Sequence, residues 1–144
     1  MDNLIIKKVD TLQELSDAQE VRRQVFIEEQ GIKREEEFDG LDQNSDHIIV
    51  YGNNVPVGTA RIRYKNDVLA KLERIAVLKS YRGRGIGRGI VKASLKLAQT
   101  KGASEVTLHA QQSAIGFYEK LGFQQEGEPF EEAGIPHIAM SKKL

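Results

Sequence analysis

Apolar residues recur along the chain with two different periods, and these periods predict the helices and strands. Spacings of three and four after Thr11, and again from Ile86 to a stop at Gly102, are typical of the buried face of a helix. Short apolar runs, several of them rich in β-branched residues, are typical of strands. The predicted strands are 4–9, 47–51, 55–64, 72–78, 105–110, 123–127 and 135–141, and a further short helix is predicted at 114–121.

Polar residues between these segments predict how the segments begin and end. Thr11 and Glu14 have the spacing of a capping box, and the helix they start is expected to end near Gln30-Gly31. The polar stretch 33–46 is expected to be a loop or a short helix. Ser113 is expected to cap the helix at 114–121, and a loop containing Glu131, Glu132 and Gly134 is expected between the last two strands. The order β-α-(α)-β-β-β-α-β-α-β-β predicts one α/β or α+β domain spanning residues 1–144.

Composition narrows the classes of protein to consider. The chain has 144 residues, of which 40% are hydrophobic, and no run reaches the roughly 20 apolar residues that a membrane helix needs. The first residues lack the apolar core of an export signal. There is no cysteine, which excludes thiolate catalysis and suits a reducing cytoplasm, and the three histidines lack metal-ligand spacing. We therefore expect a cytoplasmic protein without a metal centre or a membrane partner.

The net charge is zero, but the charges are unevenly distributed along the chain. The segment 28–46 holds eight acidic residues and two basic ones, whereas 71–101 holds nine basic residues and one acidic one. Either segment can simply be a solvated face, and for the acidic one this reading is about as good as a functional one.

A glycine-rich turn at 82–87 lies between a predicted strand and a predicted helix, where exposed amides and a helix N-terminus favour a phosphate ligand. Its spacing does not fit the P-loop, because no Lys-Ser or Lys-Thr follows the glycines. It does not fit the dinucleotide-binding GxGxxG pattern either. A third pattern, [R/Q]xxGxG, is met by Arg82, Gly85 and Gly87. The flanking strand and helix and the zero net charge argue against nucleic acid as the partner.

This third pattern resembles the pyrophosphate loop of the GCN5-related N-acetyltransferases (GNAT family). The segment from Ala114 to Phe123, AIGFYEKLGF, resembles the family's second signature, A-x-x-x-Y-x-x-x-G-F. Four further segments, 21–30, 45–47, 110–111 and 134–137, resemble the ElaA/YjcF-like branch of that family. Together these similarities cover nearly the whole chain.

The resemblance implies a GNAT fold and a site for acetyl-CoA as the acyl donor. The sheet would be mixed, mostly antiparallel and splayed, with about six to seven strands flanked by helices, and the strands at 72–78 and 106–111 would separate at one end. The pantetheine arm would lie in that gap and pair with the β-strand backbone. Gln111 stands where many members of the family have Asn. The cofactor-binding residues implied are Ile75, Ala76, Val77, Arg82, Gly83, Arg84, Gly85, Ile86, Gly87, Gln111 and Tyr118.

The implied reaction is direct attack of a primary amine on the thioester in a ternary complex, which needs a group to take a proton and an acid for the thiolate. Tyr118 matches the family's acid. Glu73, in an otherwise apolar strand, is a candidate base whose pKa partial burial would raise. The alternatives are a partner of Arg74, Lys71 or another cation, or an outward-facing strand residue. His47 and His137 are candidate bases that are more often structural, and His109 is expected to be a packing residue.

The acceptor is much less explicit in the sequence than the donor. The acidic run at 28–46 favours a small cationic amine or a basic peptide, if that run borders the acceptor. A non-catalytic acyl-CoA-binding or regulatory module is the alternative function. An acyl-homoserine-lactone-type synthase is a third reading that the short chain makes less attractive. The resemblance is also compatible with a homodimer.

Overall fold

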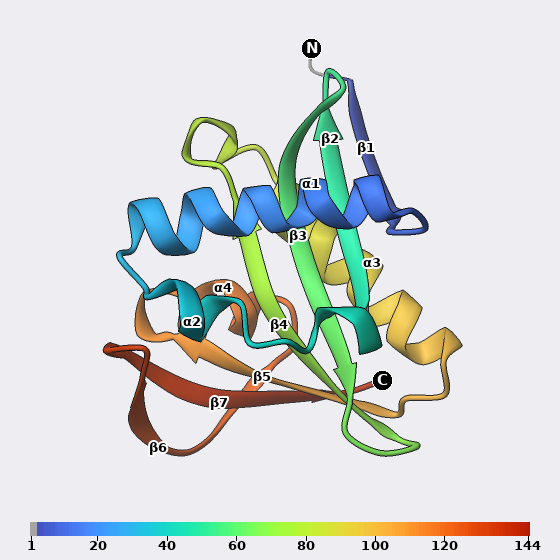
Figure 1. Cartoon of the computed structure of the whole chain (residues 1–144). Helices are drawn as coiled ribbons and strands as arrows, with labels where there is room; N and C mark the ends of the chain where they lie inside the picture. The colour runs from blue at the N-terminus through green and yellow to red at the C-terminus, as the bar shows by residue number, and fades with distance from the viewer. Residues whose placement is uncertain (1–2) are drawn as a thin grey trace.

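A seven-stranded sheet forms the centre of the computed structural model, which describes residues 3–144 (Figure 1). The strand order is β1-β2-β3-β4-β5-β7-β6, and β4 and β5 are parallel while the other neighbouring pairs are antiparallel. The strands are β1 (Leu4–Lys8), β2 (Asp46–Gly52), β3 (Val55–Tyr64), β4 (Leu69–Val77), β5 (Glu105–Gln111), β6 (Gln124–Glu132) and β7 (Ile135–Lys143). This mixed, mostly antiparallel sheet confirms the predicted fold class.

Within residues 3–144, four α-helices flank the sheet, and two of them, α1 and α4, are extended by a short π or 3₁₀ segment. The α-helices are α1 (Leu12–Arg22), α2 (Arg34–Glu37), α3 (Ile86–Thr100) and α4 (Ile115–Lys120). The predicted capping box is present at the start of α1: the Glu14 amide donates to the Thr11 hydroxyl, and the Thr11 amide donates to the Glu14 carboxylate, both at 3.1 Å. The other segments are a π-helix (Arg23–Glu29) and 3₁₀ turns at Asp42–Asn44, Lys79–Tyr81 and Gln112–Ala114.

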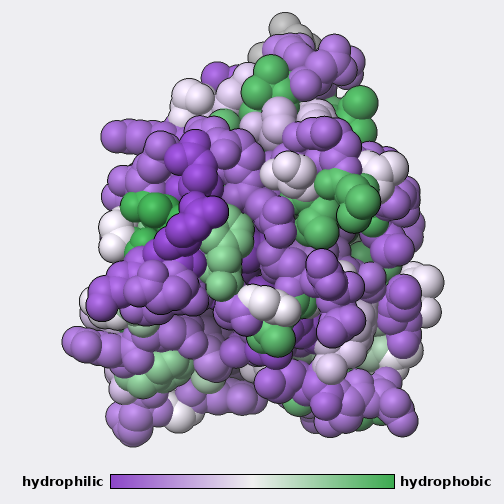
Figure 2. Space-filling model, in the orientation of Figure 1, coloured by the Kyte–Doolittle hydropathy of each residue, from purple (hydrophilic) through white to green (hydrophobic). Residues whose placement is uncertain are grey.

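Helices cover both faces of the sheet, and each face has its own core. In Figure 1, α1 crosses in front of β2, β3 and β4, and α3 lies behind them. The larger core includes Ile90 of α3 and Tyr118 of α4, packed on alternate residues of the strands. The smaller core joins Val21 and Val25 to Ala76 of β4. The face of the molecule seen in Figure 2 is mostly hydrophilic, with scattered hydrophobic residues.

The sheet opens between β4 and β5. Their parallel pairing extends only from Leu69↔Glu105 to Leu72↔Leu108, although β4 continues to Val77 and β5 to Gln111. A β-bulge sits where the two strands begin to diverge: β4 has one more residue than β3 between the pairs Arg61↔Glu73 and Thr59↔Ala76. Bulges bend a strand and increase its twist. The predicted separation of these strands is therefore confirmed.

The local differences from the predicted elements concern helix and strand ends. The second half of the first helix is π-helical rather than α-helical. Ser113 does not cap α4, whose N-cap is Ala114 without a side-chain hydrogen bond. The loop expected around Glu131 and Glu132 is wrong as well, because β6 continues through Glu132 and only residues 133–134 form the turn. A Gly at φ 73° beside Ala133 at φ 52° closes that hairpin tightly.

Candidate active site

A cavity of about 380 Å³ lies where β4 and β5 diverge. Its walls come from the π-helical segment, α2 and its following loop, β3, β4, β5, α4 and the β6–β7 turn. Predicted site residues that line it are Glu73, Ile75, Gln111 and Tyr118. The cavity thus collects groups from segments as far apart in the sequence as Phe26 and His137.

The π-helical segment shapes one wall of this cavity. Its wider turn is visible in the hydrogen bond from the Gln30 amide to Val25 O, at 3.1 Å, and the Ile32 amide donates to Phe26 O, at 2.9 Å, just after the segment ends. Phe26 and Gln30 line the cavity as a result. The Gln111 side chain donates to Gln30 Oε1 at 3.0 Å, which links the end of β5 to this wall. π-Helical turns are rare and often mark functional sites.

The glycine turn after β4 has the backbone conformation that its sequence predicts. Gly83 and Gly85 have φ values of 79° and 78°, and a side chain on either would meet no atom within 4 Å. Gly85 is the N-cap of α3 and no side chain caps that helix, so its first amides are open to a ligand. Ile86 itself is buried in the core, while Arg84 stacks over Tyr81 with 4.9 Å from guanidinium carbon to ring centre.

The Arg82 side chain connects the glycine turn to the π-helical segment. Its Nε donates to Val77 O at 2.9 Å, and its two terminal nitrogens contact the Glu29 carboxylate at 2.7 Å each. The hydrogen bond with Glu29 raises the pKa of Arg82, and the same contact lowers the pKa of Glu29. Arg82 is therefore oriented by a partner that lies 53 residues earlier in the chain.

One edge of β4 is left without a strand beside it. The Leu78 amide donates to Val57 O at 2.9 Å, which places the pairs 57↔78 and 59↔76 on the hydrogen-bonding side toward β3. The peptide groups of Val77 and, by alternation, Ile75 therefore point to the open side. Ala76 packs on α1 instead, with only 4% of its surface exposed.

Tyr118 enters the gap from the α3 side of the sheet. Its ring packs edge-on against Phe117 and Phe123, with ring centres 5.0 and 5.9 Å away, and it is 8% exposed. Burial raises its pKa, so the phenol stays protonated at neutral pH. Within residues 3–144 its hydroxyl makes no hydrogen bond, although Tyr118 lines the cavity. A buried phenol without a partner is suited to donate to a ligand atom.

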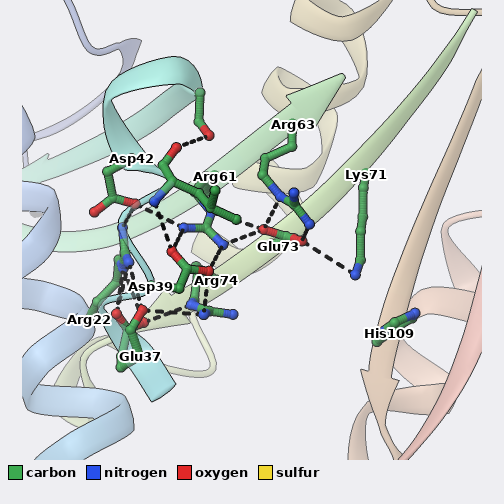
Figure 3. Close-up of polar contacts among 12 residues, drawn as sticks. Arg22, Glu37, Asp39, Asp42, Arg61, Arg63, Lys71, Glu73, Arg74 and His109 are labelled. Carbon is green, nitrogen blue, oxygen red and sulfur yellow. Dashed lines mark hydrogen bonds and ion pairs between the residues drawn. The ribbon is translucent and has the colours of Figure 1, made fainter. Parts of the chain in front are cut away.

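The Glu73 carboxylate forms ion pairs with three cationic side chains, as Figure 3 shows. Its carboxylate contacts Arg61 at 2.5 Å, Arg63 at 2.8 Å and Lys71 at 3.4 Å. Burial alone would raise the pKa of Glu73, but the hydrogen bond from Arg63 and the charge of Arg61 outweigh it and lower the pKa to about 2. The prediction of a raised pKa is therefore wrong, and the ion-pair interpretation is confirmed for Lys71, whereas Arg74 pairs with Glu37 and Asp39 instead. A carboxylate with so low a pKa is a weak proton acceptor.

Arg22 and Arg61 extend this cluster into a buried ion-pair network that the sequence analysis missed. Both guanidinium groups are almost fully buried, with 0% and 1% of the residue exposed. Arg22 contacts Glu37 and Asp42 at 2.8 Å each, and Arg61 contacts Asp39 and Asp42 at 2.8 and 3.0 Å. For Arg61 a usable signal was its position between Ala60 and Ile62 in a strand, since a cation buried there needs a partner. Arg22 has mostly polar neighbours and gave no such signal.

Most of the acidic run at 28–46 is neutralised by these and other contacts. Six of its eight acidic residues are ion-paired: Glu28, Glu29, Glu37, Asp39, Asp42 and Asp46. Glu35 and Glu36 have no such pair within the described part of the chain, and Glu36 lines the cavity, as Lys71 and Arg63 do. The run therefore does not present a broad free negative charge, and the cavity wall carries both signs.

The three histidines occupy different environments. His47 is buried under the sheet's α1 face, its Nε2 lies 2.9 Å from Asp42 O, and burial lowers its pKa; it does not line the cavity. His137 lines the cavity but is 7% exposed. His109, expected to be a packing residue, lines the cavity too and lies across the gap from Lys71 and Glu73 in Figure 3.

Within residues 3–144, no group of three or more His, Asp and Glu side chains is placed to hold a metal ion. The helices described there are also too short or too polar to cross a membrane.

Comparisons with known proteins agree with this geometry. A family model described as acetyltransferase (GNAT) domain matches residues 11–144. The uncharacterized N-acetyltransferase YjcF of Bacillus subtilis is 48% identical over 131 residues, which covers 90% of this chain and 93% of that protein. The structure of a Lactobacillus plantarum protein named as an N-acetyltransferase matches with a TM-score of 0.91 and 29% identity, over 98% of both chains.

Escherichia coli ElaA matches with a TM-score of 0.85 and 26% identity, over 99% of this chain and 100% of its own. The similarity to YjcF and ElaA confirms the branch that the sequence motifs indicated. With the family model covering all but the first ten residues, the chain belongs to the GNAT family of acetyltransferases and is an acyltransferase.

Proposed function

We propose that this acyltransferase moves the acetyl group of acetyl-CoA directly to a primary amine in a ternary complex. The observation that carries the proposal is the gap between β4 and β5, which ends at the unpartnered hydroxyl of Tyr118. The chain has no cysteine to form a thioester intermediate, which supports direct transfer.

In this proposal the donor binds along the open edge of β4. The peptide groups of Ile75 and Val77 on that edge pair with the pantetheine amides as an added strand would, and Val77 O also accepts from Arg82 Nε. The pyrophosphate is held by the amides from Gly83 to Gly87 at the N-terminus of α3, with Arg82 beside them. Gln111, already hydrogen-bonded at the end of β5, orients the arm from the other side of the gap.

Tyr118 acts as the acid in this proposal. When the amine nitrogen attacks the carbonyl carbon, a C–N bond forms, the C–S bond breaks, and the sulfur takes a proton from the phenol or is stabilised by its hydrogen bond. Because burial raises its pKa, the phenol keeps its proton at neutral pH and can donate a hydrogen bond to the sulfur as negative charge develops there. The carboxylate of Glu73 holds Arg61, Arg63 and Lys71 in place rather than taking the amine's proton.

The acceptor is an amine on a molecule of mixed polarity, because the cavity wall carries both cationic and anionic side chains. A panel of polyamines, aminoglycosides, amino acids and short peptides distinguishes the possible classes of acceptor. If the acceptor is cationic, as the acidic run suggested, polyamines and aminoglycosides should be acetylated fastest. A homodimer is still only a prediction from the resemblance.

The test is free-thiol release from acetyl-CoA across this panel, with Tyr118→Phe compared with Tyr64→Phe. Tyr64 donates to Asp46 at 2.8 Å away from the cavity, so its variant controls for the loss of a phenol. Tyr118→Phe should lower kcat about 10²-fold or more while the Kd for CoA stays within about threefold. Tight CoA binding without turnover on any amine would favour the non-catalytic module instead.

A further inference from the structure

We infer that His109 is the general base that takes the proton of the attacking amine, and that Glu132 positions its ring. This inference rests on the proposed amine acetylation and adds to it the group that its acid, Tyr118, does not provide. It is drawn from side chains of β5 and β6 that meet at the cavity wall opposite β4.

His109 stands where the two strands come apart. The last β4–β5 pair is Leu72↔Leu108, so His109 is the first residue of β5 beyond the paired region. Val106, Leu108 and Ala110 are buried on the α3 side, and the alternation of a strand turns His109 to the other side. Its side chain is 30% exposed and lines the cavity. The imidazole is therefore accessible from the α1 side of the gap.

The contact with Glu132 fixes which ring nitrogen is free. His109 Nδ1 lies 3.1 Å from Glu132 Oε1. An ionised carboxylate only accepts hydrogen bonds, so Nδ1 carries the hydrogen and Nε2 keeps its lone pair in the neutral ring. Phe130 holds the ring from the side, with the ring centres 4.9 Å apart at an interplanar angle of 78°. A histidine held at Nδ1 by a carboxylate, with Nε2 open, is the arrangement that general bases use.

The other candidates are less suited to take the proton. Glu73 accepts from three cations at once. His137 donates from Nδ1 to Ile135 O at 2.7 Å, and its Nε2 faces Glu132 Oε2 at 3.8 Å rather than the open cavity. His47 lies outside the cavity. Among the residues that line it, His109 combines an orienting partner with an accessible nitrogen.

The two proton-transfer groups then lie on opposite sides of the gap. Tyr118 belongs to the core on the α3 side, whereas His109 faces the α1 side. The amine proton passes to His109 Nε2 as the C–N bond forms, and the sulfur takes its proton from Tyr118 as the C–S bond breaks. Glu132 stabilises the imidazolium that results. His109 then returns its proton to solvent and Tyr118 regains one, so no further reactant is needed.

The experiment measures free-thiol release from acetyl-CoA with hydroxylamine as a small, mostly neutral nucleophile and with the best acceptor of the amine panel. His109→Ala should lower kcat for the panel amine about 10²- to 10⁴-fold. The Kd for CoA should stay within about threefold of wild type, because the residue is outside the donor site. Added imidazole should restore part of the rate, and the loss with hydroxylamine should be smaller.

Glu132→Gln tests the positioning role, and Glu131→Gln is its matched control on the next residue of β6, which alternation turns to the opposite side. Glu132→Gln should lower kcat by a smaller factor than His109→Ala and shift the acid limb of the pH–rate profile, while Glu131→Gln should change neither. The charged groups that face His109 and enter that profile are Glu132 and His137 from β6 and β7, and Lys71 and Glu73 from β4.

A His109→Ala variant that keeps more than about a third of the wild-type kcat would overturn the inference. Loss of turnover that imidazole does not restore, in a variant with unchanged far-UV circular dichroism, would overturn it too. His109→Gln is the second variant if His109→Ala does not fold. These results leave the proposed function standing, whereas a wild-type protein without thiol release on any nucleophile would refute that function itself.

Discussion

Replacing Glu73 with Gln removes the charge on which three cations converge but keeps the shape of the side chain. Lowering its pKa from 4.5 to about 2 corresponds to a stabilisation of about 3 kcal/mol. Removing one partner of a buried ion pair costs about 3–5 kcal/mol. The lower end applies here, because Arg61 keeps Asp39 and Asp42, and Arg63 is 26% exposed and can reach water. We expect Glu73→Gln to lose about 3 kcal/mol of unfolding free energy at pH 7.

The pH dependence of this loss follows from the sign of the shift. A carboxyl whose folded pKa is depressed stabilises the fold above its unfolded pKa, and that stabilisation disappears as pH falls toward the folded value. Wild type and Glu73→Gln should therefore differ most near pH 7 and by about half as much near pH 3. Urea unfolding followed by far-UV circular dichroism measures both values.

Glu35→Gln is the matched control, because Glu35 lies in the same acidic run, is exposed and has no ion pair within residues 3–144. Its unfolding free energy should change by less than about 0.5 kcal/mol. A loss below about 1 kcal/mol for Glu73→Gln, or one that does not depend on pH, would refute the network argument. A stable variant that instead loses turnover about 10²-fold would restore Glu73 as the base.

Three further substitutions test other parts of the structure. Gly85→Ala places a residue with a side chain at φ 78°, so it should lower the free energy of unfolding by about 1–2 kcal/mol and weaken CoA binding in calorimetry. Its control is Gly116→Ala, which lies at an ordinary φ with open space around it and should have neither effect. Arg61→Met should cost about 3–5 kcal/mol in urea unfolding because it leaves buried carboxylates unpaired, while Arg23→Met, at a half-exposed pair, should cost less than about 1 kcal/mol. Thr11→Ala should cost about 1 kcal/mol by removing the capping box.

The elements of the fold could be predicted because their signals are local. The capping residue Thr11, the strand at 55–64 and the glycines at 83 and 85 each act within a few residues of their own position, and all three appear as the sequence indicated. The gap between β4 and β5 was expected only from the resemblance to a family, and the order of the strands in the sheet was not predicted. Periodicity alone does not say which strands are neighbours, since register depends on contacts between distant segments.

In the candidate site, too, the features with local signals could be predicted and the contacts between distant segments could not. Tyr118 lies in a motif that spans ten residues, and its place in the gap agrees with the motif. The partners of Glu73 and His109 lie 12 and 23 residues away, on other strands. The pattern within each strand shows only that Glu73 lies in an apolar run and that His109 lies in an alternating one. It does not show that Arg61 contacts Glu73 or that Glu132 contacts His109.

Arg74, at the bulge of β4, links the charged groups of the cavity to distant parts of the fold. The bulge holds this residue at φ 55°, which costs a non-glycine residue about 1–2 kcal/mol. Its guanidinium donates to Glu36 O at 3.1 Å and Glu37 O at 3.2 Å, and it pairs with Asp39 at 3.3 Å. The residue at the bulge of β4 is thus held by the end of α2 and the loop after it, which also form a cavity wall. Asp39 pairs with both Arg74 and Arg61, and Arg61 pairs with Glu73, so Asp39 links the contacts of the bulge to the cations that keep Glu73 ionised.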